Sequence, residues 1–122
     1  MQDFKNLKVW KEAYDFSIKV YKAPAKFPSN EQFGITSQLR RASTSIAANI
    51  AEGTGRQSNA AFLAFLYNSI GSSKECENFL LLSRDLGYLS DETYIDLNES
   101  CIRISKMLNS LIQTIKKSKS TS

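Results

Sequence analysis

The chain of 122 residues is long enough for one domain with a hydrophobic core, and 42% of its residues are hydrophobic. Sixteen Lys and Arg against twelve Asp and Glu give a net charge of +4, typical of an ordinary surface and also of polyanion-binding proteins. The sequence has no histidine, no phosphate-binding loop and no dinucleotide fingerprint. We therefore expect a protein that is not an enzyme and has neither a cofactor nor a metal site.

The two cysteines, Cys76 and Cys101, lie in apolar periodic segments. We expect two reduced core thiols rather than a disulfide. The charged sequence that follows Met1 predicts no signal peptide. No apolar run approaches the roughly 18 residues of a membrane span. These features predict a cytoplasmic protein without membrane association.

Residues 7–23 predict the first helix, with Asn6 as its cap. Apolar and aromatic residues recur there at spacings of three and four, and lysines such as Lys8 and Lys11 fill the opposite side. Two prolines beyond the helix end it. We expect the periodic stripe to face the core rather than to stack nucleic-acid bases; it comprises Trp10, Ala13, Tyr14, Ser17, Ile18 and Tyr21.

Residues 36–52 predict the second helix, ended by Gly53 in a left-handed conformation. Its expected buried stripe comprises Leu39, Ala42, Ser43, Ile46, Ala47 and Ile50. Residues 42–48 are small on nearly every side. A small solvent-facing side would allow another helix to approach closely.

Residues 58–86 predict the third helix, capped by Ser58 or Asn59 and closed by Gly87. One heptad seam comprises Phe62, Leu66, Ser69, Ser73, Cys76, Leu80 and Ser83. Apolar residues flank this seam on both sides and span more than half of the helix circumference. Such a helix needs a second partner, so we expect a homo-oligomer.

Residues 90–117 predict the fourth helix, and residues 118–122 a polar tail. The unbroken seam of this helix comprises Tyr94, Leu97, Cys101, Ile104, Leu108, Leu111 and Ile115. Spacings that alternate between three and four are typical of a long helix in a bundle. The sequence therefore predicts an all-α, up-down-up-down four-helix bundle over a single domain, residues 1–122.

Two sets of polar residues are candidates for a functional site. The expected nucleic-acid ligands are Arg40, Arg41, Arg56, Lys8 and Lys11. The expected structural polar cluster is Asn49, Glu52, Glu75 and Glu77. The arginines either pair with Glu75 or Glu77 and fix the helix register, or bind phosphate through paired donors.

The end of the second helix carries three polar residues at spacings of three and four: Asn49, Glu52 and Arg56. We expect Glu52 to hold Arg56 and Asn49 to cap a loop amide. The direction of the arginine side chains distinguishes structural ion pairs from phosphate ligands.

Three segments resemble the 23S rRNA intervening-sequence protein family: TSQLRR at 36–41, SIAANIAEG at 45–53 and DLGYLS at 85–90. The resemblance extends from residue 3 to about residue 115. It implies a short four-helix bundle that assembles as a pentamer, a role in RNA binding, and no enzymatic activity. A relative, the accessory variability protein of diversity-generating retroelements, is a basic pentameric barrel that binds nucleic acid and a reverse transcriptase.

Two hypotheses of function follow from these features. The first is a non-enzymatic homo-oligomer, expected to be a pentamer, that binds RNA or DNA by neutralising backbone charge with basic residues. The alternative is a protein-interaction scaffold that binds another protein and has no direct contact with nucleic acid. Neither hypothesis names the RNA, the protein partner or the cellular role.

Overall fold

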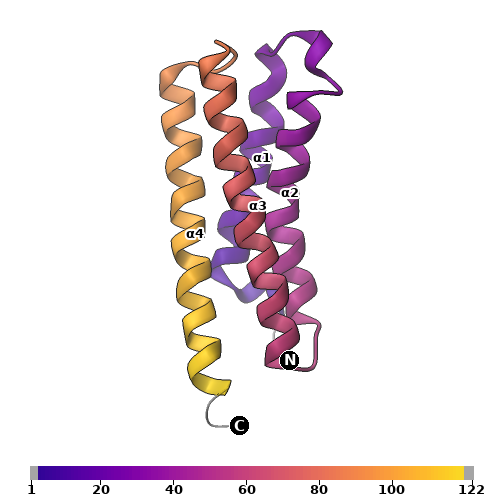
Figure 1. Ribbon diagram of the computed structural model, residues 1–122, viewed down its shortest axis with the longest axis vertical. Coiled ribbons are helices and arrows are strands. Elements are labelled where there is room, and N and C mark those ends of the chain that lie inside the picture. The colour runs from indigo at the N-terminus through magenta and orange to yellow at the C-terminus, as the bar shows by residue number, and fades with distance from the viewer. Residues whose placement is uncertain (1–2, 120–122) are drawn as a thin grey trace.

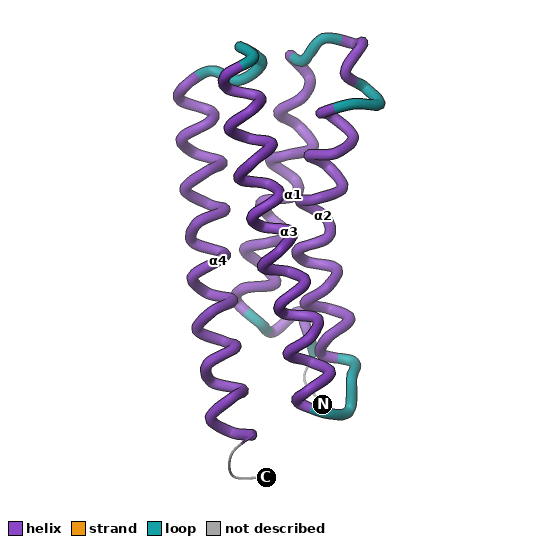
Figure 2. Tube along the Cα trace, in the orientation of Figure 1, coloured by secondary structure: helices purple, strands orange, loops and turns teal. Residues whose placement is uncertain are grey.

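The computed structural model describes residues 3–119, apart from the side chains of residues 25, 26 and 119. Four helices run along the long axis of the molecule: α1 (Lys8–Lys22), α2 (Ile35–Thr54), α3 (Asn59–Asp85) and α4 (Asp91–Lys119) (Figure 1). No strand occurs among the described residues (Figure 2). The all-α prediction is confirmed, and α4 extends into the predicted polar tail, whose residues 120–122 lie outside the described residues.

The helices pack side by side, with α1 and α3 each contacting both α2 and α4. The α2–α3 connection lies at the end of the molecule that carries both termini, which we call the base (Figure 1). The α1–α2 and α3–α4 connections lie at the opposite end, the tip. The α1–α2 connection contains two short 3₁₀ helices, Ala23–Lys26 and Ser29–Glu31.

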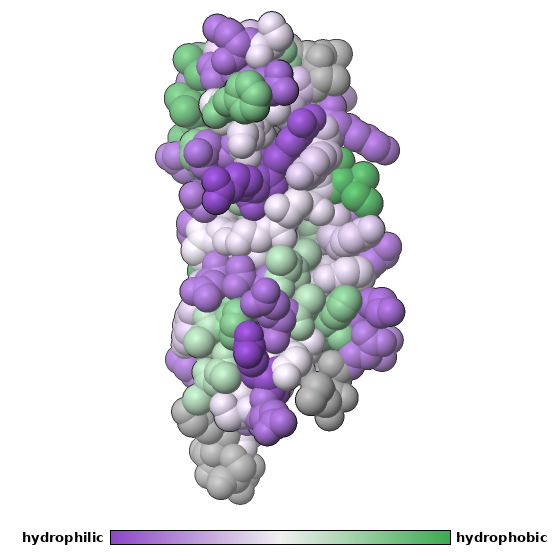
Figure 3. All heavy atoms as spheres, turned by 90° about the vertical axis from the view of Figure 1, so that its right-hand side faces the viewer, coloured by the Kyte–Doolittle hydropathy of each residue, from purple (hydrophilic) through white to green (hydrophobic). Residues whose placement is uncertain are grey.

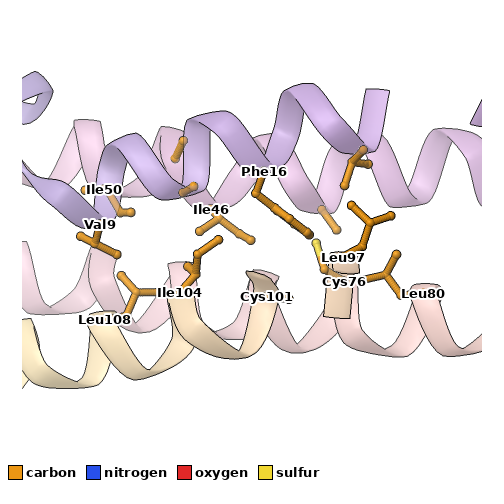
Figure 4. Packing of buried hydrophobic residues seen from close by; sticks show 14 of the residues in the cluster. Val9, Phe16, Ile46, Ile50, Cys76, Leu80, Leu97, Cys101, Ile104 and Leu108 are labelled. Carbon is orange, nitrogen blue, oxygen red and sulfur yellow. The ribbon is translucent and has the colours of Figure 1, made fainter. Parts of the chain in front are cut away.

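The core lies along the axis of the bundle. The fully buried side chains include Phe16, Ile46, Leu66, Ile104 and Leu108. Figure 4 shows core residues of the four helices pointing toward one another, with the Phe16 ring directed toward a cysteine sulfur. All six residues of the stripe predicted for α2 are buried. Each large aliphatic side chain removed from water contributes about 1.5–3 kcal/mol, so this seam supplies much of the stability.

The buried face of α1 differs from the predicted stripe. The buried residues are Val9, Ala13, Phe16, Ser17 and Val20. Tyr14, Ile18 and Tyr21 are 44%, 42% and 49% exposed, so the prediction that they face the core is wrong. Two stripes with the same spacing share this helix, and the aliphatic one fits the interior while the tyrosine hydroxyls keep their water. The predicted cap is also wrong: Leu7 precedes the helix, and no side chain caps it.

Gly53 lies inside α2 rather than at its end, so the prediction of a left-handed Gly53 is wrong. A Cβ atom at this position would lie 2.7 Å from Cδ1 of Phe62 and 3.1 Å from Cβ of Phe65. The glycine therefore serves close approach of α3. The left-handed residue is Gly87, with φ of 79°, which closes α3 as predicted.

Serines on the α3 seam bond to both neighbouring helices. The hydroxyl of Ser69 donates to the carbonyl oxygen of Ile46 in α2 at 2.9 Å. The hydroxyls of Ser73 and Ser105 in α4 are 2.7 Å apart. Each of these three buried hydroxyls thus has a partner, and the small side chains allow the backbones to approach closely.

Candidate nucleic-acid interface

Arg40 extends from α2 toward the end of α1. Its Nη2 donates to the carbonyl oxygen of Tyr21 at 2.8 Å, and its guanidinium lies 4.9 Å from the centroid of the Tyr21 ring. Its Nε is buried and has no hydrogen-bond partner within the described part of the chain. A carbonyl at a helix end and an aromatic face are both good partners for guanidinium. Arg40 therefore joins α1 to α2.

Arg41, the next residue, extends toward α3 instead. It lines a small hollow of about 170 Å³ together with Gln38, Ala42, Ser45 and Glu75. Neither the Arg41 nor the Glu75 side chain forms a hydrogen bond or ion pair with any residue that the structure describes. The two adjacent arginines thus lie on different sides of α2, and Arg41 keeps its donors available to solvent.

Arg56 lies at the base, just beyond α2. Its Nη2 is 4.0 Å from Oε2 of Glu52, and its guanidinium lies 4.6 Å from the centroid of the Phe65 ring. The predicted contact between Glu52 and Arg56 is confirmed as a loose, exposed pair. A pair of this kind contributes about 0–1 kcal/mol.

Asn49 was predicted to cap a loop amide, and this prediction is wrong. Its Nδ2 donates to the carbonyl oxygen of Ser45 at 2.9 Å and to the Ser45 hydroxyl at 3.0 Å. The Ser45 hydroxyl in turn accepts from Ser72 of α3 at 2.8 Å. Because α2 continues to Thr54, no loop amide lies within one turn of Asn49.

Glu77 does not pair with an arginine, contrary to the first alternative above. Its Oε2 lies 3.1 Å from Nζ of Lys74, one turn earlier on α3, in a contact without hydrogen-bond geometry. Arg84 likewise contacts its neighbour Asp85 at 3.0 Å and the ring of Tyr94 at 4.6 Å. The ionic neighbour of Glu77 is therefore a lysine of its own helix, and its Oε2 accepts no hydrogen bond within the described chain.

The predicted ligands and polar residues thus do not form one site. Arg40 binds α1, Arg41 faces α3, and Arg56 lies 15 positions further along the chain than Arg41, roughly 22 Å at helical rise. Lys8 and Lys11 lie on α1 and form part of another surface, described next.

A concave surface between α1 and α4 carries two adjoining hollows. Two hollows of about 380 and 470 Å³ share Lys8, Arg103 and Met107. We call this surface the basic groove. Its apolar floor comprises Leu7, Val9, Met107 and Leu111. Its cationic rim comprises Lys8, Lys11, Arg103 and Lys106.

The smaller hollow contains three cations, Lys8, Arg103 and Lys106, and no carboxylate. In the adjoining hollow, Arg103 lies 3.4 Å from Glu12, and Lys11 lies 3.2 Å from Asp15. Lys8 and Lys106 contact no acidic group anywhere in residues 3–119. The smaller hollow therefore has a net positive charge on an apolar floor, an arrangement suited to phosphate groups.

The sequence predictions missed Arg103 and Lys106. A signal for them exists: after Glu99 the chain has no acidic residue, but it has five cations, Arg103, Lys106, Lys116, Lys117 and Lys119. These cations on the second half of α4 form part of a basic hollow only because α1 places Lys8 beside Arg103 and Lys106.

The two cysteines form a pair of neighbouring thiols in the core. Both thiols are free and buried, and the Cys101 Sγ donates to the carbonyl oxygen of Ser73 at 3.1 Å. The thiol of Cys101 and burial raise the pKa of Cys76 far above its ordinary range. Cys76 therefore remains a protonated thiol near neutral pH.

Across the described chain, no three His, Cys, Asp or Glu side chains lie close enough together to hold a metal ion. No helix between residues 3 and 119 combines the length and the apolar character needed to cross a bilayer.

A solved structure from Bacteroides thetaiotaomicron VPI-5482 is similar to this chain: a protein of unknown function from the S23 ribosomal protein family. The two share 30% sequence identity, and the alignment covers 85% of this chain and 97% of that one with a TM-score of 0.78. No curated protein matches the sequence. The model of the 23S rRNA-intervening sequence protein family matches residues 5–110. With this match over most of its length, the chain belongs to the 23S rRNA-intervening sequence protein family.

Proposed function

We propose that this protein is a non-enzymatic homo-oligomer, a pentamer of up-down-up-down bundles, that binds RNA or DNA through the basic groove. The observation that supports it most is the hollow with Lys8, Arg103 and Lys106 around an apolar floor and no carboxylate. Two of these three cations contact no acidic group within the described chain, so phosphates replace only water around them.

The mechanism is neutralisation of the phosphate backbone with release of counterions. Lysine binds phosphate as a point charge, and Arg103 adds paired donors. No side chain of the rim is fixed to read base edges, so sequence discrimination is small. Arg41 is a further ligand on the opposite side of the bundle, whereas Arg40 is occupied by Tyr21.

The binding experiment measures the affinity of the full chain for structured RNA and for single strands between about 50 and 200 mM salt. The log–log slope is expected at about −0.7 to −0.9 per phosphate contact. The double variant Lys8→Gln/Lys106→Gln is expected to make this slope shallower by about two contacts. As a control, Lys74→Gln removes the same kind of charge from α3.

Absence of binding at about 50 mM salt to either nucleic acid contradicts the proposal. If Lys74→Gln makes the salt dependence of binding shallower by the same amount as the double variant does, the groove is not the binding surface.

The oligomer is supported by side chains that a monomer leaves exposed. The outer side of α2 carries Thr44 and Ala48, and Figure 3 shows a pale, near-neutral band at mid-height on that side of the molecule. Large apolar residues are also exposed near the tip: Leu81, Leu82, Leu86 and Ile95. Light scattering at micromolar concentration is expected to give about five times the chain mass of 13.7 kDa. A single species of one chain mass contradicts the oligomer.

The second candidate function is a protein-interaction scaffold, and the apolar floor of the basic groove supports it. Met107 and Leu111 are only partly buried there. A protein partner would cover this floor and bind with weak salt dependence, whereas nucleic acid gives a steep dependence. The salt series therefore separates the two functions.

A further inference from the structure

A row of aromatic side chains extends along α1 from the 3₁₀ helix before it (Phe4–Asn6), and we call it the aromatic ladder: Phe4, Trp10, Tyr14 and Tyr21. The ring centroids of Phe4 and Trp10 are 4.9 Å apart, as are those of Trp10 and Tyr14. The planes of the last two rings differ by only 26°. Tyr14 and Tyr21 are nearly half exposed, whereas Trp10 is partly buried and packs against the core.

Cations accompany the rings of the ladder. Nζ of Lys5 lies 6.0 Å from the Phe4 ring, and Nζ of Lys11 lies 5.7 Å from the Tyr14 ring. The guanidinium of Arg40 lies 4.9 Å from the Tyr21 ring. Asp15 also lies among these cations, 3.2 Å from Nζ of Lys11. Lys5 and Arg40 have no ion-pair partner within the described chain, so the row still suits a flat, anionic polymer.

The ladder and the basic groove share Lys11. This lysine lines the larger hollow of the groove and also approaches the Tyr14 ring. Phosphates bound along the groove therefore bring their bases beside the ladder. Aromatic side chains interleaved with cations are the arrangement by which proteins bind single strands without sequence preference.

We infer that α1 binds single-stranded nucleic acid, with phosphates in the basic groove and bases stacked on Trp10, Tyr14 and Tyr21. The inference rests on the proposed function and adds the substrate class, a single strand. In a duplex the bases already stack on one another and their faces are not available. The ladder thus selects single strands, while the groove attracts any phosphate backbone.

Trp10 is the only tryptophan of the chain, so its fluorescence reports directly on the ladder. The full chain is titrated at about 50 mM salt with a single-stranded RNA of about 12 nucleotides and with a duplex of the same sequence. Single-stranded RNA is expected to quench the Trp10 emission and to bind more tightly. The duplex is expected to leave the emission unchanged.

The variant Tyr14→Leu is expected to weaken binding of the single strand about tenfold and binding of the duplex little, because each stacked base contributes about 5- to 150-fold. Tyr67 provides a matched control on α3. It is 47% exposed, and Nζ of Lys116 lies 5.7 Å from its ring, as Lys11 does from that of Tyr14. Tyr67→Leu is expected to change neither affinity.

Three results overturn the inference, and they are distinguishable. If single strand and duplex bind equally, or Tyr14→Leu behaves as Tyr67→Leu does, the ladder has no role and the groove remains. If neither nucleic acid binds, the proposed function fails as well. If acrylamide cannot quench Trp10 in the free protein, a second copy of the chain covers the ladder.

Discussion

The α2–α3 and α1–α4 interfaces are built from opposite kinds of residues. Between α2 and α3, Ser69 bonds to the backbone of Ile46, and Gly53 leaves room for Phe62. Between α1 and α4, long charged side chains such as Lys19 and Arg103 reach their acidic partners at 3.5 and 3.4 Å near the surface. The first interface closes because its side chains are small, and the second keeps a groove because its side chains are large.

This difference separates the stretch that folds the chain from the surface available for binding. The segment 36–56 attracts attention in the sequence because it is rich in small residues and arginines. Its small residues mainly bring two helices together, and Arg40 joins it to α1. The open surface lies on the opposite pair of helices.

The largest expected effect on stability is at the closed interface. Gly53→Ala places a methyl group 2.7 Å from the Phe62 ring. Overpacking of this kind costs about 1–3 kcal/mol, partly offset by the better helix propensity of alanine, so we expect a net loss of about 1–2 kcal/mol. Urea unfolding of the full chain measures it.

Gly71→Ala is the matched control for Gly53→Ala. It lies in the interior of α3, and an added Cβ there meets nothing within 4 Å. Alanine is expected to raise the free energy of unfolding by about 0.5–1 kcal/mol. A stabilising Gly53→Ala would show that the α2–α3 interface is looser than described.

The adjacent arginines give the next effect. Arg40→Ala removes a charged hydrogen bond to Tyr21 and a ring contact, and we expect a loss of about 1 kcal/mol after allowing for its exposure. Arg41→Ala removes no contact within the described chain and is expected to change stability by less than about 0.5 kcal/mol. Thermal unfolding of both variants tests this. Equal losses would place Arg41 among the structural arginines.

The tip of the bundle lies outside both interfaces and provides a comparison for them. There the Tyr88 hydroxyl donates a hydrogen bond to Oε2 of Glu31 at 2.7 Å. This hydrogen bond, followed by burial and the Glu31 charge, raises the pKa of Tyr88 above its ordinary 10.0. A raised folded-state pKa means that the contribution is present below pH 10 and decreases as pH rises through the folded pKa. Tyr88→Phe is expected to remove this part of the alkaline loss in a pH series of unfolding. An unchanged alkaline slope would contradict it.

The smallest effect is expected in the basic groove. Ser110 is exposed and lines the smaller hollow. Ser110→Leu adds far more volume than Gly53→Ala does, yet it is expected to change stability by less than about 0.5 kcal/mol, because the side chain enters open space. Urea unfolding measures the change. A loss comparable to that of Gly53→Ala would mean that the groove is a closed interface.

The sequence predicted what depends on one helix at a time. The stripe of α2, the closure of α3 by Gly87 and most of the α4 seam were visible, because periodicity and turn chemistry are local. On the α4 seam, Tyr94 and Leu111 are only partly buried, and the buried Ile112 was missed. The face of α1 was not, since two stripes with the same spacing compete and only tertiary packing chooses between them. The position of Gly53 was missed because its role depends on Phe62, nine residues later.

The candidate site was less predictable for the same reason. Lys8 and Lys11 were identified individually, but their relation to Arg103 and Lys106 requires the contact of α1 with α4. Arg40 and Arg41 are neighbours in the chain, and the helix directs them toward different partners about 100° apart. Proximity in the sequence therefore gave the wrong impression of a cluster.

The rate at which the buried cysteine pair is alkylated can report how often the helix bundle opens. Cys76 and Cys101 come from the two longest helices and are both inaccessible to solvent in the native state. An alkylating reagent can modify them only after α3 and α4 separate, because the reactive thiolate needs water. The rate of modification thus reads out how often the bundle opens, and a ligand that binds the folded surface is expected to lower it.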